Sequence, residues 1–343
     1  MSGAPLRIGV VGTGGWARSF WAEAASAPEV ALVSCWDPSP GAAAAFAAGH
    51  GIQTAQSLDD LVTTRDIEAV AIFAPNNHHR AAAERAAAAG KHVFTDKPIA
   101  NTVEDAAAMI RACDRGRVRL MVGHSSRYHA GPRTLKALLE SGRLGQLAMV
   151  EAHTSHSGGT RLTPDQWRWH RQEAPGGPLM QPAVHTFDTL HYLLGPTRRV
   201  TAVSDDSLLP SEIEDVFLTL LEFDSGLLAY VGTNYVSPPA GYTRIYGRGG
   251  NAVLEGDRLT LALANEEEPW SPKAEEVALP RVSAPAAEMA EFARAVREGR
   301  PPETGGREGL LALGVVWAGI LSAQRRQPVG VREALGEAAA LVD

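Results

Sequence analysis

The sequence predicts an α/β protein of two domains, with a parallel sheet in the first and a large, mostly antiparallel sheet in the second. Three observations lead to this. The chain has 343 residues, enough for two hydrophobic cores. Short β-rich runs alternate with alanine-rich helical runs up to residue 122. Between residues 198 and 264, successive strand patterns are separated by turn signals such as DSG and GRGGN.

The first domain is predicted to cover residues 1–122. Strands that alternate with helices favour a parallel sheet covered on both faces. The predicted strands are residues 6–11, 30–36, 67–74, 92–95 and 118–122. The predicted helices are residues 15–26, 41–49, 79–89 and 103–115, and their alanine runs are good helix formers.

The pattern changes near residue 123, and we expect the second domain to cover residues 123–343. A polar loop rich in Trp and Arg precedes its second helix. The predicted helices are residues 131–141, 182–194, 285–298 and 306–323. The predicted strands lie near 147–155 and within 198–264.

Composition and charge narrow the possible functions. The formal net charge is −7, which disfavours a nucleic-acid partner. The two cysteines form no disulfide framework and favour a reducing, cytoplasmic location. The start of the chain lacks the pattern of a signal peptide. The longest apolar run, LLALGVVWAGIL at 310–321, is too short to span a bilayer and is predicted to be a buried helix, so no membrane partner is expected.

A glycine-rich turn, GVVGTGGWA at 9–17, follows the first strand and opens a helix. Its first glycine permits a tight turn, its second lets a diphosphate approach the backbone, and its small third residue lets helix pack on strand. This context predicts a Rossmann domain that binds a dinucleotide at the helix N-terminus. The predicted cofactor contacts at this turn are Gly12, Thr13, Gly14, Gly15, Trp16 and Ala17.

The second strand ends in Trp36-Asp37, where a carboxylate can bind both ribose hydroxyls and repel a 2′-phosphate. Asp37 therefore favours NAD over NADP. Ser39 leaves some room for a phosphate, but no arginine stands beside it. The alternative is that Asp37 is only a turn residue before Pro38.

The stretch GKHVFTDKPIANT at 90–102 places Asp96-Lys97-Pro98 at the carboxyl end of a buried strand, where ligands bind in open α/β sheets. It resembles the AGKHV-x-x-EKP segment of the Gfo/Idh/MocA oxidoreductases, the family of glucose–fructose oxidoreductase and inositol dehydrogenase. The resemblance continues through APNNHH (74–79), GHSSRYHAGP (123–132), QWR (166–168) and GGPLMQPAVHTFD (176–188). It covers nearly the whole chain.

The resemblance implies that Lys97 bridges the substrate hydroxyl and the nicotinamide, and that His185 is the histidine of the substrate domain. Asp96 stands where a Glu is more usual and keeps the charge beside the ribose. Ala74, Pro75, Asn76 and His79 are expected near the nicotinamide. For His79, packing at the start of a helix is the alternative.

Gln181 occupies the place where many members of the family carry an aspartate, four residues before the histidine. An amide cannot take or give a proton at working pH. We therefore expect Gln181 to position the substrate. Lys97 is the favoured proton carrier, because burial and the charge of oxidised nicotinamide both lower the pKa of a lysine. His185 is the alternative carrier.

Other polar and aromatic residues are expected near the substrate. Asp188 follows His185 by one helical turn and either holds its ring or pairs with a structural partner. The aromatic side chain of Trp167 suits a sugar face, and arginines suit hydroxyls or the carboxylate of a sugar acid. The remaining predicted substrate contacts are Arg127, Tyr128 and Arg168, with Arg161 nearby.

These expectations favour an NAD-dependent dehydrogenase or reductase that acts on a secondary hydroxyl of a sugar, sugar derivative or cyclitol. One alternative is an enzyme with tightly bound NAD that recycles it within a turnover, with glycoside cleavage or epimerisation as the net reaction. The other is a non-catalytic NAD-binding regulator. The histidine spacing fits no compact zinc site, so no metal is expected. The resemblance also implies a homodimer or homotetramer formed through the sheet of the second domain.

Overall fold

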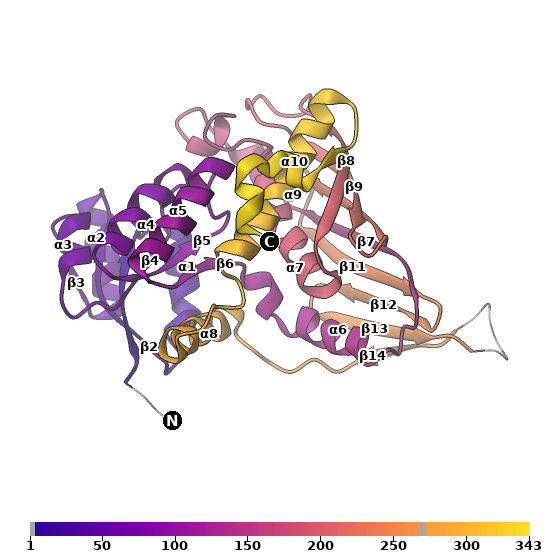
Figure 1. Ribbon diagram of the computed structural model, residues 1–343, viewed down its shortest axis with the longest axis horizontal. Helices are drawn as coiled ribbons and strands as arrows, with labels where there is room; N and C mark the ends of the chain where they lie inside the picture. The colour runs from indigo at the N-terminus through magenta and orange to yellow at the C-terminus, as the bar shows by residue number, and fades with distance from the viewer. Residues whose placement is uncertain (1–3, 266, 268–269, 271) are drawn as a thin grey trace. The chain divides into compact units, whose positions relative to one another are not determined.

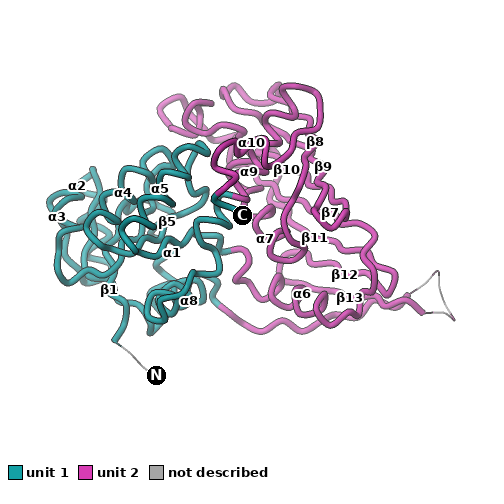
Figure 2. The backbone as a smooth tube through the Cα atoms, viewed as in Figure 1, with its two compact units in different colours: residues 1–125, 283–310, 341–343 teal, residues 126–282, 311–340 magenta. Residues whose placement is uncertain are grey.

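The computed structural model describes residues 4–265, 267, 270 and 272–343. The chain forms two compact units (Figure 1, Figure 2). Unit 1 comprises residues 1–125, 283–310 and 341–343, and unit 2 comprises residues 126–282 and 311–340.

Unit 1 is built on a six-stranded parallel sheet in the order β3-β2-β1-β4-β5-β6. The strands are β1 (Leu6–Val11), β2 (Val30–Trp36), β3 (Gln53–Thr54), β4 (Ala69–Ile72), β5 (His92–Asp96) and β6 (Leu120–Gly123). The sheet confirms the predicted Rossmann fold; only the short β3 was not predicted. The strand order reverses between β1 and β4, and ligands bind at the carboxyl ends of strands beside such a reversal.

The helices of unit 1 are α1 (Gly15–Ala24), α2 (Pro40–His50), α3 (Leu58–Thr63), α4 (His79–Ala88), α5 (Val103–Gly116) and α8 (Ala284–Glu298). Four of them begin at a hydroxyl side chain that accepts a backbone N–H of the first turn: Ser39, Ser57, Thr102 and Ser283. Such caps set where each helix starts.

The division of the chain differs from the predicted one in a specific way. We expected everything after residue 122 to form the second domain, but residues 283–310 return to unit 1. The reason is the packing of α8 against α1, with the ring of Phe292 5.9 Å from that of Phe94 on β5. The sequence of α8 shows that the helix has an apolar face. It does not show which of the two sheets that face will cover.

Unit 2 contains a nine-stranded sheet in the order β14-β13-β12-β11-β7-β10-β9-β8-β15. The pair β7–β10 is parallel and the other pairs are antiparallel, which confirms the predicted mostly antiparallel sheet. The strands are β7 (Leu147–Ser155), β8 (Thr197–Asp205), β9 (Val216–Phe223), β10 (Leu228–Asn234), β11 (Ala240–Gly247), β12 (Gly250–Glu255), β13 (Arg258–Leu263), β14 (Ala274–Val277) and β15 (Val329–Gly330).

Helices cover one face of this sheet. Helix α6 (Ala130–Glu140) contacts β12 and β13, α7 (Val184–Leu194) contacts β7, and α10 (Val331–Leu335) contacts β8 (Figure 1). Along β9 the residues alternate, with Phe217 and Leu221 buried and Leu218 and Leu220 exposed. One face of the sheet is therefore core, and the other is open in this chain.

Helix α9 (Gly306–Arg325) contains the long apolar run. Its length and hydropathy would allow it to cross a membrane, and it is the one helix of the described residues for which this holds. However, 61% of its most apolar window is buried inside the protein, with Leu313 and Val316 fully buried. The predicted buried helix is confirmed.

Candidate active site

The turn after β1 has the shape that a diphosphate needs. Gly12 has φ +83°, and a Cβ there would lie 2.8 Å from the backbone of Phe73 and Ala74. At Gly14 and Gly15, by contrast, no described atom lies within 4 Å of an added Cβ. No side chain among the described residues caps the first turn of α1. The N–H groups of this first turn are therefore available to an anion.

Two glycine substitutions distinguish the contribution of this turn to protein stability from its contribution to NAD binding. Gly12→Ala is expected to destabilise the protein by about 1–3 kcal/mol, because the backbone is strained and crowded there. Gly14→Ala meets no atom, so its thermal stability should match wild type while its affinity for NAD falls at least tenfold. Thermal unfolding and NAD titration measure the two effects. Unchanged NAD affinity in Gly14→Ala would show that the diphosphate does not bind at this turn.

Asp37 lies directly after β2 and holds the glycine turn. Its Oδ2 accepts hydrogen bonds from the backbone N–H of Thr13 at 2.8 Å and from the Thr13 hydroxyl at 3.1 Å. Its Oδ1 accepts the N–H of Ser39 at 2.8 Å. Oδ2 already accepts two hydrogen bonds, so only Oδ1 keeps a lone pair for a ribose hydroxyl. Of the two roles considered for Asp37, the turn role is observed, and the contact with the ribose stays a prediction.

The predicted residues at 74–79 follow β4. The side chain of Asn76 is buried and donates to Asn101 Oδ1 at 3.0 Å. His79 is fully buried, with Nε2 2.9 Å from the carbonyl oxygen of Ala74 and Nδ1 3.1 Å from that of Pro98. Burial lowers the pKa of His79, although Asp96 favours the charged form. His79 thus lies between the segment that follows β4 and the segment that follows β5.

Asp96 ends β5 and Lys97 follows it, with a cis peptide before Pro98. Burial raises the pKa of Asp96, while Lys97 beside it acts in the opposite direction. The indole of Trp16, from the glycine turn, donates a hydrogen bond to Asp96. The glycine turn and the strand end that carries Lys97 are thus directly linked, which sequence reasoning did not predict.

In unit 2, two glycines precede the helix that carries Gln181 and His185. Gly176 and Gly177 have φ +72° and +38°, and a Cβ on Gly176 would lie 2.6 Å from Ile320. A single π-helical turn, Leu179–Ala183, then leads into α7. We predicted one regular helix with Gln181 and His185 four residues apart on one face. The wider turn around Pro182 changes that spacing, and such turns are frequent at functional sites.

Asp188 is paired with Arg127. Arg127 donates from Nε to Oδ2 at 2.8 Å and from a terminal nitrogen to Oδ1 at 2.5 Å, and both side chains are buried. Arg127 also lies over the ring of Tyr192, at 5.2 Å. Of the two roles considered for Asp188, the structural partner is the one observed. We expected both residues to contact the substrate, but in this structure their side chains are paired with each other.

The other predicted substrate contacts are also engaged within unit 2. Tyr128 is buried beneath the guanidinium of Arg133, which lies 4.7 Å from its ring centre. Trp167 packs on a small apolar cluster of Ala174, Ile213 and Tyr235. Arg168, which is exposed, covers the ring of Trp167 at 4.1 Å. A sugar would reach the Trp167 face only if this guanidinium moved.

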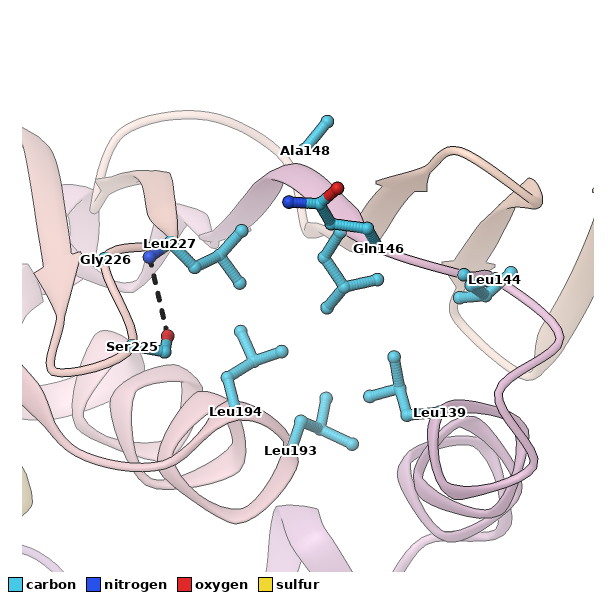
Figure 3. A pocket seen from close by; sticks show the side chains of 11 residues that line it. Leu139, Leu144, Gln146, Ala148, Leu193, Leu194, Ser225, Gly226 and Leu227 are labelled. Carbon is cyan, nitrogen blue, oxygen red and sulfur yellow. Dashed lines mark hydrogen bonds between the residues drawn. The ribbon is translucent and has the colours of Figure 1, made fainter.

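His185 is half-buried and lines a cavity of about 340 Å³ in unit 2. Its lining is rich in hydroxyl and imidazole groups, including Ser126, His129, Thr186 and Thr189. A second cavity, of about 520 Å³, has a different character (Figure 3). Leucines from α6, α7 and the β9–β10 turn line it, and none of its lining side chains can ionise. The cavity at His185 is therefore the one suited to a polyhydroxyl ligand.

Sequence reasoning did not name most of the residues that line the His185 cavity, among them Thr189, His129 and Asp257. Thr189 follows His185 by one helical turn, so helical spacing could have indicated it. His129 precedes α6 and Asp257 lies in the β12–β13 turn, and no local pattern marks either as a site residue. Over the described residues, no group of three or more His, Cys, Asp or Glu is arranged to hold a metal ion.

Parts of both units match models of known protein families. Residues 6–124 match the model of the oxidoreductase family with an NAD-binding Rossmann fold. Residues 132–253 match the GFO/IDH/MocA C-terminal domain. The chain belongs to the GFO/IDH/MocA oxidoreductase family. Its cofactor is NAD, and the uncapped glycine turn fits the diphosphate of that group.

Members of this family with assigned activities are similar over much of the chain. A 1,5-anhydro-D-fructose reductase from Ensifer adhaerens is 32% identical over 228 residues, 65% of this chain and 67% of the relative. An inositol 2-dehydrogenase from Rhizobium meliloti (strain 1021) is 25% identical over 336 residues, 95% of this chain and 99% of the relative.

Among solved structures, a protein from Desulfitobacterium hafniense DCB-2, provisionally named an NADPH-dependent oxidoreductase, superposes with a TM-score of 0.93. It is 28% identical, and the match covers 98% of this chain and 100% of that chain. The fold of this GFO/IDH/MocA oxidoreductase is therefore shared along its whole length.

Proposed function

We propose that this oxidoreductase transfers a hydride between NAD and a secondary hydroxyl of a sugar, sugar derivative or cyclitol. The observation that carries the proposal is the Asp96-Lys97 pair at the carboxyl end of β5, in a sheet whose glycine turn is open to a dinucleotide. The family relatives named above act on an anhydrosugar and on inositol, which supports this class of substrate.

When bound, NAD supplies the acceptor for the hydride that leaves the carbinol carbon. The chain must then remove the hydroxyl proton. We assign that step to Nζ of Lys97, with the carboxylate of Asp96 beside it. Gln181 is assigned a positioning role, since its amide both donates and accepts hydrogen bonds. His185 is assigned a substrate contact and is the alternative base.

A single-turnover experiment tests this function. Protein loaded with NAD is mixed with neutral sugars, sugar acids, glycosides and cyclitols, and the fluorescence of reduced nicotinamide is followed. We expect a signal with at least one class, including for an enzyme that recycles its cofactor. Absence of signal from every class, with NAD binding confirmed, would contradict the proposal and favour a regulatory role.

We further propose that the protein is a cytoplasmic homodimer or homotetramer, assembled through the open face of the unit 2 sheet. Its two cysteines are free and buried, which supports a reducing compartment. The open face carries large apolar side chains at Val203, Leu218, Leu220 and Leu228, which are 44–62% exposed. Exposed apolar patches of this kind mark interaction sites.

Leu220→Arg tests the proposed interface. Since a charge in an apolar interface is costly, the variant is expected to elute as a smaller species than wild type in size-exclusion chromatography with light scattering. Leu208→Arg is the matched control, because Leu208 is equally exposed but follows β8 in a loop. The same mass for wild type and Leu220→Arg would place the interface elsewhere.

A further inference from the structure

The cavity at His185 extends well beyond that histidine. It follows α7 from His185 to Thr189, about 6 Å along the helix axis at 1.5 Å per residue. It also reaches the start of α6 at His129 and Gly131, and the β12–β13 turn at Asp257. Its volume of about 340 Å³ is within the range of small-molecule sites, roughly 300–1,000 Å³. A ring held at His185 would therefore leave room for a group attached to it.

The walls of the cavity offer both donors and acceptors. Helix α6 begins at Ala130 and no side-chain hydrogen bond caps it, so the N–H groups of Ala130 and Gly131 are available as donors, whereas Pro132 has none. The hydroxyl of Thr189, on a residue only 8% exposed, has no hydrogen-bond partner among the described residues. Asp257 is an exposed carboxylate and can only accept. A sugar hydroxyl satisfies both kinds of group, since it accepts and donates.

The charge of the cavity disfavours anionic substrates. The structure describes all of its lining residues, and none is Lys or Arg. Asp257 would repel a phosphate or carboxylate there. Arg127, Arg244 and Arg258 each adjoin a lining residue in sequence. They are paired with Asp188, Glu151 and Glu276, respectively. Arg281 lines an adjoining cavity of about 360 Å³ that shares His129, Gly131 and Asp257 with this one.

We propose that this cavity binds a second, uncharged sugar ring. The substrate is then a neutral glycoside or oligosaccharide. Its reacting ring lies at His185, and its attached ring lies against Thr189, the start of α6 and Asp257. The proposal rests on the proposed function, because the reaction at the first ring is the one assigned above.

The test measures binding and turnover separately on the full-length protein loaded with NAD. The probes are D-glucose with maltose and cellobiose, D-galactose with lactose, and the charged sugars D-glucuronate and D-glucose 6-phosphate. Calorimetry or saturation-transfer NMR reports binding, and absorbance of reduced nicotinamide reports turnover. At least one neutral two-ring probe is expected to bind tenfold or more tightly than its single ring and than either charged sugar.

Substitutions then locate the second ring. Thr189→Val removes a hydroxyl, and Asp257→Asn replaces a charged acceptor with a weaker, neutral one. Each is expected to lower the preference for two rings over one about fivefold. Thr189→Ser keeps the hydroxyl and should restore the preference. Asp224→Asn, an exposed carboxylate in the β9–β10 turn, should leave the preference at its wild-type value.

The outcomes separate the two proposals. Preferred binding of a two-ring probe without reduced nicotinamide would support the sugar site and contradict the proposed function. Equal binding of one-ring and two-ring probes, tighter binding of a charged sugar, or no binding by any probe would overturn the second-ring site. A two-ring preference that survives both Thr189→Val and Asp257→Asn would overturn it as well.

Discussion

Replacing Lys97 with arginine is expected to lower the single-turnover rate of nicotinamide reduction by about 10²–10⁴-fold, the usual contribution of a positioned acid or base. Arginine keeps the positive charge beside Asp96 but cannot give up a proton to become a base. The variant therefore distinguishes a role of Lys97 in proton transfer from a role of its positive charge alone. The rate is measured at saturating NAD, with NAD affinity determined separately.

Lys91→Arg is the matched control. Lys91 lies just before β5, at the opposite end from Lys97, and its Nζ donates to the carbonyl oxygens of Thr64 and Ile67. The same substitution there should leave the rate within about twofold of wild type. If Lys97→Arg also kept its rate, the proton would leave by another group. Loss of the rate in His185→Asn would then identify the histidine as that group.

The second large effect concerns stability. Asp188→Asn is expected to lower the free energy of unfolding by about 3–5 kcal/mol, because it leaves the buried guanidinium of Arg127 uncompensated. At about 2–4 °C per kcal/mol for a domain of this size, the unfolding midpoint should fall by roughly 6–20 °C. Differential scanning calorimetry measures this shift.

The double variant Arg127→Met/Asp188→Leu provides the control. With both charges removed, no unpaired charge stays buried, so the double variant should unfold at a higher temperature than Asp188→Asn alone. A different pattern would restore the substrate role first expected for these residues. In that pattern Asp188→Asn keeps the wild-type midpoint but raises the KM for the sugar.

Local sequence patterns were sufficient to predict the parts of the fold that depend on interactions between residues close in sequence. The glycine turn at Gly12 is recognisable because its strained backbone requires glycine next to a strand and a helix. The position of Lys97 followed from the strand before it. The alternation of strands and helices likewise indicated the parallel sheet of unit 1.

Other features depend on contacts between distant residues and could not be predicted. Arg127 and Asp188 are 61 residues apart, so their ion pair has no local signature. The return of α8 depends on Phe292 meeting Phe94. The π-helical turn at Gln181 reflects Pro182, whose missing N–H was visible in sequence but whose effect on spacing was not anticipated. The cavity at His185 is assembled from α6, α7 and several strands.

The central claim is that this chain removes a hydride from a sugar carbon although Gln181 replaces the usual aspartate. The most direct test is a single turnover of the NAD-loaded protein with a substrate that carries deuterium at the reacting carbon. We predict that reduced nicotinamide forms with the deuterated substrate, and forms more slowly than with the unlabelled one. If NAD and the sugar both bind and no reduced nicotinamide forms with either substrate, the claim is contradicted.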